Sequence, residues 1–292
     1  MPNLTVVKTL LRELVTTQRS PRVPEPDLVM DDPDKVAAFE RAGREDGALA
    51  GIYLFHCAQI CEILYPGDTV VDLGCGPANQ LGMVARLNPE SQFIGLDLSE
   101  DMLERAQAHV SQLGLKNVEF RRCDITKLDF LDEQSVDAVF STVSLHHLPS
   151  VDDLGRTFSE VNRVLRPQGG LYLVDFGHLK SEKSILDLAN LYADRQPELF
   201  TLDYLASLRA AFHLPDFKRL VAEHFESRAR LCSTFLAPFL VAVKSPCRRE
   251  PDEQLRQALL QVRQELPQYH QRDLKDLIKF FQSGGLKSNL LN

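Results

Sequence analysis

The stretch VVDLGCGPANQ, residues 70–80, decides the fold of this chain. An apolar, β-branched run ends near Asp72, the chain turns on Gly74 and Gly76, and a helix is predicted to begin at Asn79. Glycine at such a turn lets the backbone approach a ligand closely. Ligands of open α/β sheets bind at the carboxyl ends of the strands, so this loop is predicted to contact a nucleotide-like molecule.

Short β-branched runs alternate with helical stretches on both sides of this loop, which is typical of repeated βαβ units. The predicted strands are 69–73, 92–98, 118–123, 136–142 and 171–176, and the predicted helices between them are 79–87, 101–113 and 151–165. Two last strands, 228–234 and 239–244, are joined by a link too short for a parallel crossover. The predicted fold is a Rossmann-like α/β fold: an open sheet of seven mostly parallel strands with an antiparallel edge strand and helices on both faces.

Further helical segments flank and interrupt this core. Amphipathic helices are predicted at 4–17 and 36–64, with a proline-rich joint between them, and two more lie in the tail, broken near Pro267. These patterns predict a helical N-terminal cap at 1–66, a core at 67–244 with an inserted helical cover at 181–226, and a C-terminal helical tail at 245–292.

Composition and charge exclude several classes of protein. The 292 residues are 44% hydrophobic and 25% charged, as in an ordinary folded protein. A net charge of −8 is unfavourable for binding a phosphate backbone. The six cysteines form no CxxC pair and no apolar run is long enough to cross a bilayer. We therefore predict a cytoplasmic protein with no nucleic-acid or membrane partner.

Acidic residues end three successive predicted strands. Asp97 ends the second strand, where a carboxylate can accept hydrogen bonds from both hydroxyls of a ribose. Asp124 ends the third, where it can accept from the exocyclic amine of adenine. A nicotinamide cofactor would call for a third glycine where Asn79 stands, and it would not call for Asp72. These three acids indicate a nucleoside-bearing cofactor other than a nicotinamide.

This combination resembles the class I S-adenosylmethionine-dependent methyltransferases over residues 68–244. The segment DAVFSTVSLHHLP, residues 137–149, is similar to the fourth-strand motif of that family, and EVNRVLRPQGGLYLVDF, residues 160–176, is similar to the helix and strand that follow. The resemblance implies S-adenosylmethionine as cofactor. It implies these contacts: Asp72 near the ammonium, Gly74, Cys75 and Gly76 under the methionine part with Ser141 or Thr142 beside it, Asp97 on the ribose, Leu98 and Met102 around the adenine, and Asp124 and Ile125 at its edge.

Two histidines, His146 and His147, follow the predicted fourth strand at the edge of the expected site. Histidine titrates near neutrality and is suited to remove a proton from a methyl acceptor. Several small-molecule N- and C-methyltransferases resemble this segment with one histidine that aligns best with His147, so His147 is the first candidate for a base or substrate ligand and His146 the second. Packing at a helix start is the alternative for both.

Other candidates have simpler alternatives. Asp175 and His178 stand at and just beyond the end of the fifth strand, where family members often contact substrate, or where a loop acid is merely solvated. Tyr53, Phe55 and His56 could close over the methyl group or simply pack a helix. Cys57 and Cys61 lie one helical turn apart and could bind arsenite or a soft metal. Without a third thiol we expect core packing there and no metal site.

The substrate is indicated by the segments outside the common core. The N-terminal helices and the insertion are rich in Leu, Phe and Tyr, which resembles the covers of ubiquinone/menaquinone-biosynthesis methyltransferases. The predicted function is methyl transfer by SN2 to an O, N or C atom of a small, apolar or aromatic acceptor. One alternative is a non-catalytic or regulatory S-adenosylmethionine-binding protein that acts through its terminal helices, and another is a nicotinamide oxidoreductase. A monomer and a homodimer are both compatible with the sequence.

Overall fold

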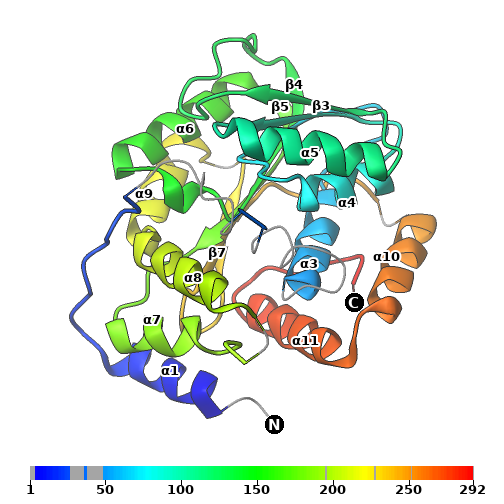
Figure 1. Cartoon of the computed structure of the whole chain (residues 1–292). Helices are drawn as coiled ribbons and strands as arrows, with labels where there is room; N and C mark the ends of the chain where they lie inside the picture. Colours follow the sequence, from blue (N-terminus) through cyan, green and yellow to red (C-terminus); the bar gives the residue numbers. More distant parts are fainter. Residues whose placement is uncertain are drawn as a thin grey trace.

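A central sheet organises the molecule (Figure 1). The computed structural model describes residues 4–26, 36–37, 49–194, 196–226, 228–250 and 252–291. The strand order is β3-β2-β1-β4-β5-β7-β6, with bounds β1 (Thr69–Leu73), β2 (Gln92–Asp97), β3 (Val118–Arg122), β4 (Val136–Thr142), β5 (Leu165–Phe176), β6 (Arg230–Ser233) and β7 (Leu240–Lys244). β7 runs antiparallel to both of its neighbours, β5 and the edge strand β6, and the other neighbouring strands pair in parallel. This confirms the predicted open sheet of seven mostly parallel strands.

Helices cover both faces of the sheet because alternate strand residues point to opposite sides. Val70 of β1 belongs to the hydrophobic cluster on one face, while Val71 and Leu73 belong to the cluster on the other. The first face is covered by α3 (Ala50–Cys61), α4 (Asn79–Leu87), α5 (Glu100–Gln112), α10 (Glu253–Glu265) and α11 (Gln268–Ser283). The second is covered by α6 (Val151–Val164) and α9 (Leu214–His224). Strands of a sheet covered on both faces are expected to be apolar almost throughout, and β1, β4 and β7 are buried along nearly their whole length.

Side-chain caps define where several helices begin. The Ser99 hydroxyl accepts a hydrogen bond from the Met102 amide at the start of α5, and the Ser150 hydroxyl accepts one from the Asp153 amide at the start of α6. Serine is favoured at this position because it satisfies an amide that has no partner within the helix. These caps fix the points at which the chain leaves the carboxyl edge of the sheet.

The remaining helices form a cover beside that edge. It consists of α1 (Leu4–Val15), α7 (Glu182–Ala189) and α8 (Glu198–Ala210), with α1 against α7 and α7 against α8 (Figure 1). The third helix of the predicted insertion, α9, packs against α6 instead and so belongs to the layer under the sheet. Much of the predicted helix 36–64 lies outside the described residues, and its last part is α3.

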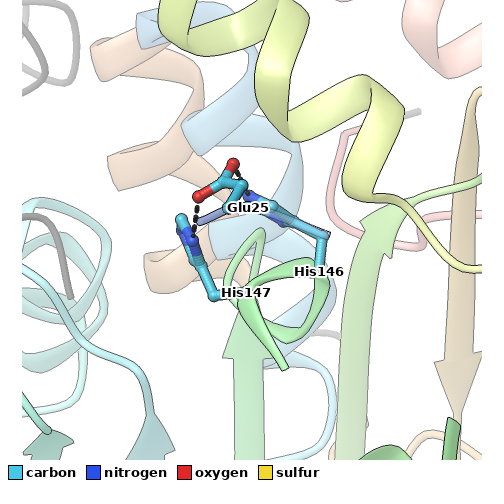
Figure 2. Close-up of side chains that lie close together, drawn as sticks. All are labelled: Glu25, His146 and His147. Atoms are coloured by element: carbon cyan, nitrogen blue, oxygen red, sulfur yellow. Dashed lines mark ion pairs between the residues drawn. The ribbon is translucent and has the colours of Figure 1, made fainter. Parts of the chain in front are cut away.

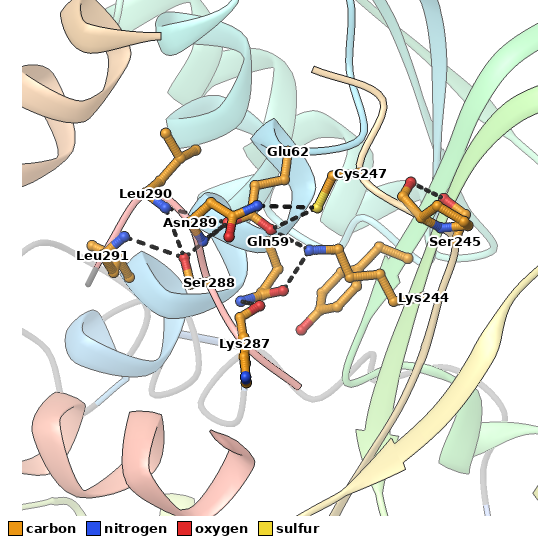
Figure 3. Close-up of polar contacts among 12 residues, drawn as sticks. Gln59, Glu62, Lys244, Ser245, Cys247, Lys287, Ser288, Asn289, Leu290 and Leu291 are labelled. Carbon is orange, nitrogen blue, oxygen red and sulfur yellow. Dashed lines mark hydrogen bonds and ion pairs between the residues drawn. The ribbon is translucent and has the colours of Figure 1, made fainter. Parts of the chain in front are cut away.

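The C-terminal helices pack on the same chain, mainly against α3. Figure 3 shows how the last residues are attached: Glu62 Oε1 accepts from the hydroxyl of Ser288 at 2.9 Å and from the amide of Asn289 at 2.5 Å. Glu62 Oε2 lies 2.5 Å from the ammonium of Lys244, and Gln59 accepts from the same ammonium at 2.6 Å. We call Gln59, Glu62, Lys244 and Ser288 the C-terminal latch.

The helices of the described ranges were also compared with the requirements for crossing a bilayer. None of them is both long enough and apolar enough to do so.

Candidate active site

A large cavity lies at the carboxyl ends of the parallel strands and has a volume of about 1060 Å³. It is lined by the β1–α4 loop, the end of β2, the loop after β4, and side chains of α1, α7, α8 and α11. Sites for one drug-sized ligand usually measure about 300–1000 Å³. The cavity is therefore large enough for a cofactor and an acceptor side by side.

Asp72, at the end of β1, is the most unusual polar group in this cavity. Its side chain is 1% exposed, and neither carboxylate oxygen has a hydrogen-bond partner among the described residues. Burial, and then the negative charge of Asp97, raise the pKa of Asp72 well above its usual range. Both polar atoms of the Gln80 side chain, which also lines the cavity, are buried without a partner. Buried polar groups are normally paired, so these two side chains fit a polar, cationic ligand group.

The turn after β1 depends on glycine at position 74. Gly74 has a φ of +69°, and a Cβ placed on it would lie 2.5 Å from both Cβ and Oγ of Ser144. The hydroxyls of Ser141 and Ser144 both donate to the carbonyl of Leu73, at 2.8 and 2.9 Å. The end of β1 and the loop after β4 are therefore held together behind the cavity floor.

Asp97 lines the cavity at the end of β2. One carboxylate oxygen accepts from the amide of Gly76 at 2.8 Å and the other from the amide of Ser99 at 2.9 Å. Burial raises the pKa of Asp97, although these two amides oppose the shift. Each oxygen keeps a further lone pair, so the carboxylate can still accept from two ligand hydroxyls.

Glu25, His146 and His147 form a cluster of three side chains (Figure 2). His146 and His147 lie on η1 (Leu145–His147), the short 3-10 turn after β4, and both line the cavity. His147 Nδ1 lies 2.6 Å from Glu25 Oε2, and His146 Nε2 lies 4.0 Å from Glu25 Oε1. On its other side, His146 Nδ1 lies 2.8 Å from a carboxylate oxygen of Asp175, whose second oxygen accepts from the His146 amide. We call Glu25, His146 and His147 the His–Glu cluster.

The charges in this cluster stabilise each other. Burial opposes ionisation of Glu25, yet the hydrogen bond and charge of His147 lower the pKa of Glu25 to about 2. Burial likewise opposes protonation of His147, but the hydrogen bond and charge of Glu25 outweigh it and raise the pKa of His147. Glu25 Oε1 also accepts from the hydroxyl of Ser207 on α8 at 2.9 Å.

Sequence reasoning missed Glu25, since it lies in the proline-rich joint and belongs to no chemical motif. Arg22 holds this joint in place: it donates to the carbonyls of His146 at 2.9 Å, Leu148 at 2.5 Å and Ala210 at 2.6 Å. Its guanidinium also lies 4.0 Å from the centre of the Phe212 ring. We call residues 16–26 the N-terminal arm.

Comparisons with known proteins agree with this geometry. Residues 64–207 match a family described as "Methyltransferase domain". The chain is 34% identical over 165 residues to the malonyl-[acyl-carrier protein] O-methyltransferase of Legionella pneumophila, across 56% of this chain and 53% of that protein. It is 34% identical over 110 residues to the demethylmenaquinone methyltransferase of Listeria monocytogenes, across 37% of this chain and 45% of that protein. The chain thus spans about half the length of these relatives.

A solved structure, the plantazolicin methyltransferase BpumL in complex with SAH, shares the fold with a TM-score of 0.52 and 16% identity, over 94% of this chain and 91% of that one. Residues 64–207 thus match a methyltransferase domain, and both of these relatives are named methyltransferases. The resemblance stated from the sequence is confirmed, and these matches support S-adenosylmethionine as the cofactor.

Several predicted cofactor residues of this methyltransferase line its cavity: Asp72, Gly74, Cys75, Gly76, Asp97, Met102 and Thr142. Ser141 does not, because its hydroxyl is buried against Leu73 and Ser144. Burial, and then the charges of Asp72 and Asp97, raise the pKa of the Cys75 thiol well above its usual range, which disfavours a thiolate nucleophile.

The predicted adenine residues Leu98, Asp124 and Ile125 lie outside the cavity lining of this methyltransferase. Asp124 is exposed, and its Oδ1 accepts from the amide and the hydroxyl of Thr126 at 2.9 and 2.8 Å, which shapes the turn after β3. Their contacts with adenine therefore stay predictions.

The remaining candidate residues differ in whether they line the cavity or pack elsewhere. Tyr53 lines the cavity of the methyltransferase, whereas Phe55 stacks on Phe281 and His56 bonds the hydroxyl of Tyr172 at 2.8 Å. Asp175 holds His146, as described above. His178 contacts the hydroxyl of Ser20 at 3.0 Å, and burial lowers the pKa of His178 to about 4. The two α3 thiols, Cys57 and Cys61, are fully buried in the core beside the sheet, as core packing predicts.

Proposed function

We propose that this protein transfers the methyl group of S-adenosylmethionine to an O, N or C atom of a small, apolar or aromatic acceptor. The observation that carries the proposal is one cavity whose lining combines a buried carboxylate with no hydrogen-bond partner among the described residues, Asp72, with many apolar side chains and with His146 and His147. The names of relatives that act on demethylmenaquinone and on malonyl-[acyl-carrier protein] are compatible with an acceptor of this kind.

The polar side chains of the cavity fit the cofactor. S-adenosylmethionine supplies an electrophilic methyl carbon on a cationic sulfonium and carries an ammonium and a ribose. Asp72 would accept from the ammonium, which would neutralise the buried carboxylate, and Gln80, which lines the same cavity, would bond another polar group of the methionine part. Asp97 would accept from the ribose hydroxyls through its remaining lone pairs.

The apolar side chains of the cavity fit an apolar acceptor. They come from α3, α7, α8, α11 and the sheet edge, and they include Ile52, Phe176, Leu188, Phe200, Tyr204 and Phe239. These side chains exclude water from the acceptor and can hold its nucleophilic atom in line with the carbon–sulfur bond, which lowers the barrier to displacement. The protein thus contributes to the reaction mainly by aligning the acceptor atom with the methyl group.

A hydroxyl or amine acceptor must also lose a proton. We assign that step to the His–Glu cluster, with His147 as the predicted proton acceptor. Glu25 fixes the orientation of the His147 ring through the 2.6 Å contact and increases its basicity. Asp175 fixes His146 in the same way, so both rings are held before the acceptor arrives.

The proposal is tested by incubating the protein with methyl-labelled S-adenosylmethionine and a panel of phenols, quinols, enols and amines, with products read by mass spectrometry. We expect label in at least one apolar acceptor. His147→Ala is expected to lower kcat on that acceptor at least about tenfold, in the range of general-base contributions, while calorimetry finds the cofactor affinity unchanged. Cofactor binding without label transfer to any of the four classes would contradict the proposal.

A further inference from the structure

We propose that the His–Glu cluster binds a divalent transition metal on the acceptor side of the cavity. Three ligand atoms, one from each of Glu25, His146 and His147, lie within 4.8 Å of one another. They come from two segments far apart in the sequence, the N-terminal arm and η1, and Figure 2 shows the carboxylate of Glu25 between the two imidazole rings. Two histidines and one carboxylate make up a recurrent metal-binding set that leaves other coordination positions open.

The spacing of the ligand atoms is close to what a metal requires. Glu25 lies 2.6 Å from His147 Nδ1 and 4.0 Å from His146 Nε2. Ligands around a tetrahedral zinc, bound at about 2.0–2.1 Å, lie about 3.3 Å from one another. The two observed separations fall on either side of that value. A shift of the carboxylate away from His147 and toward His146 brings both of these separations closer to that value, and all three ligand atoms already lie within 4.8 Å of one another.

The second shell has the form found at metal sites. A histidine that binds a metal through one nitrogen usually donates its other N–H to a carboxylate or carbonyl. Asp175 occupies that position for His146: its carboxylate lies 2.8 Å from Nδ1 and also accepts from the His146 amide. Nε2 of His146 is thereby directed to Glu25, at a distance too long for a hydrogen bond. Ser207 supports Glu25 at 2.9 Å.

The charges and ligand atoms of the His–Glu cluster indicate which metal ions it would bind. Glu25 and Asp175 bring two carboxylates to the cluster, and Asp203 lines the cavity nearby. The guanidinium of Arg22, which lies beside the cluster, donates to backbone carbonyls. Two imidazole nitrogens and one carboxylate favour zinc, iron(II) or manganese(II) over calcium and magnesium, which prefer oxygen ligands.

This inference, insofar as it concerns catalysis, rests on the proposed function, and it narrows the acceptor to an oxygen nucleophile such as a phenol or enol. An open coordination position would take the acceptor oxygen, and its proton would pass to water because metal binding lowers the pKa of a bound hydroxyl. An oxygen lone pair then forms the new oxygen–carbon bond, and the sulfur keeps the electron pair of the sulfur–carbon bond that breaks. In the metal-bound protein His147 is a ligand and not the proton acceptor.

Metal binding is tested directly on the full chain after treatment with EDTA and dialysis. Calorimetric titration with zinc chloride is expected to give one equivalent per chain. Glu25→Gln and His146→Gln are each expected to weaken zinc affinity at least about tenfold, and Asp175→Asn about 10–100-fold, as second-shell changes do. His224→Gln, at the end of α9 and away from the cavity, is the matched control and should bind zinc as the native chain does.

Cysteine is the competing source of zinc affinity, because Cys247 is exposed and Cys123 half-buried. Cobalt(II) distinguishes the two, since only thiolate ligands add a strong ligand-to-metal charge-transfer band to its spectrum. The proposal predicts a visible cobalt band without that feature, and the band is lost in Glu25→Gln. Circular dichroism and S-adenosylmethionine binding verify that each variant folds. If one of these variants does not fold, His147→Gln is tested in its place.

The inference is overturned if zinc does not bind at one equivalent, if both Glu25→Gln and His146→Gln bind it unchanged, or if cobalt reports thiolate ligands. Failure of the metal site and failure of the proposed function are separable. Methyl transfer that persists in EDTA by a chain that binds no zinc overturns only the metal site. Zinc binding as predicted, with no label transferred to any acceptor, contradicts only the proposed function.

Discussion

Asp72 is a buried carboxylate whose ionisation the folded, ligand-free protein disfavours. Its folded pKa lies above the unfolded value of 3.8, so the folded chain keeps this proton after the unfolded chain has lost it. The contribution of Asp72 to the free energy of unfolding is therefore complete at acid pH and falls as the pH rises from about 4 through the folded pKa. A cationic group bound beside the Asp72 carboxylate stabilises the ionised form and so lowers the pKa of Asp72.

Binding of the cofactor ammonium is thus expected to release a proton from Asp72, and the affinity for S-adenosylmethionine is expected to rise with pH over the same interval. Asp72→Asn should weaken binding about 10–100-fold, the loss of one charged hydrogen bond, and should flatten the pH dependence. Calorimetric titrations across pH provide the measurement. An equally steep pH dependence in Asp72→Asn would assign the effect to another group.

Gly74 and Gly114 form a natural pair for measuring the steric contact at the turn. Both have positive φ, +69° and +68°, but a Cβ on Gly74 meets Ser144 at 2.5 Å whereas one on Gly114 meets nothing within 4 Å. We expect Gly114→Ala to lower the free energy of unfolding by about 1 kcal/mol and Gly74→Ala by about 2–3 kcal/mol, with weaker cofactor binding only in the latter. Urea denaturation checks this, and equal losses would contradict the close contact.

At the scale of elements, the N-terminal arm connects α8 to η1 through Arg22 and Glu25. Arg22→Ala removes the hydrogen bonds to the carbonyls of His146, Leu148 and Ala210. We expect this change to release Glu25 from His147, so that kcat falls while cofactor affinity, which depends on Asp72 and Asp97, is retained. A fall in cofactor affinity equal to the fall in kcat would show that the arm supports the whole cavity instead.

The sheet elements were predictable because each is a local pattern. The predicted bounds of β1, β4 and α4 agree with the structure at both ends, since apolar runs and flanking turns mark them. The first residues of β5 were missed because RPQGG, residues 166–170, carries no strand pattern. The contact of Glu25 with His147 joins residues 122 positions apart and leaves no periodic signal, so only the three-dimensional structure reveals it.

At the scale of the whole molecule, the C-terminal latch attaches the last residues to α3 and β7. Glu62 and Lys244 are both buried, and Glu62 also receives the hydroxyl of Ser288 and the amide of Asn289. Sequence patterns predicted the two tail helices but left open whether they pack on this chain or on a second copy. Packing of the tail on this chain involves a buried charged pair, and the amphipathic spacing of the helices does not show whether such a pair is buried.

The latch makes a prediction about global stability. Glu62→Gln leaves the buried ammonium of Lys244 without a charged partner, so we expect the free energy of unfolding to fall by about 3–5 kcal/mol. The double variant Glu62→Gln, Lys244→Met removes both charges and should recover part of that loss. Chemical denaturation of the three proteins checks this; a single variant as stable as the native chain would contradict the importance of the pair.

S-adenosylmethionine is expected to bind at the carboxyl ends of β1 and β2 through Asp72 and Asp97. Isothermal titration calorimetry of the full chain with S-adenosylmethionine tests it most directly, with Asp152→Asn, an exposed acid of α6, as control. The account predicts one binding site per chain, strongly weakened by Asp97→Ala and by Asp72→Asn and unchanged by Asp152→Asn. Equal affinity in all four proteins, or no binding to the native chain, would contradict it.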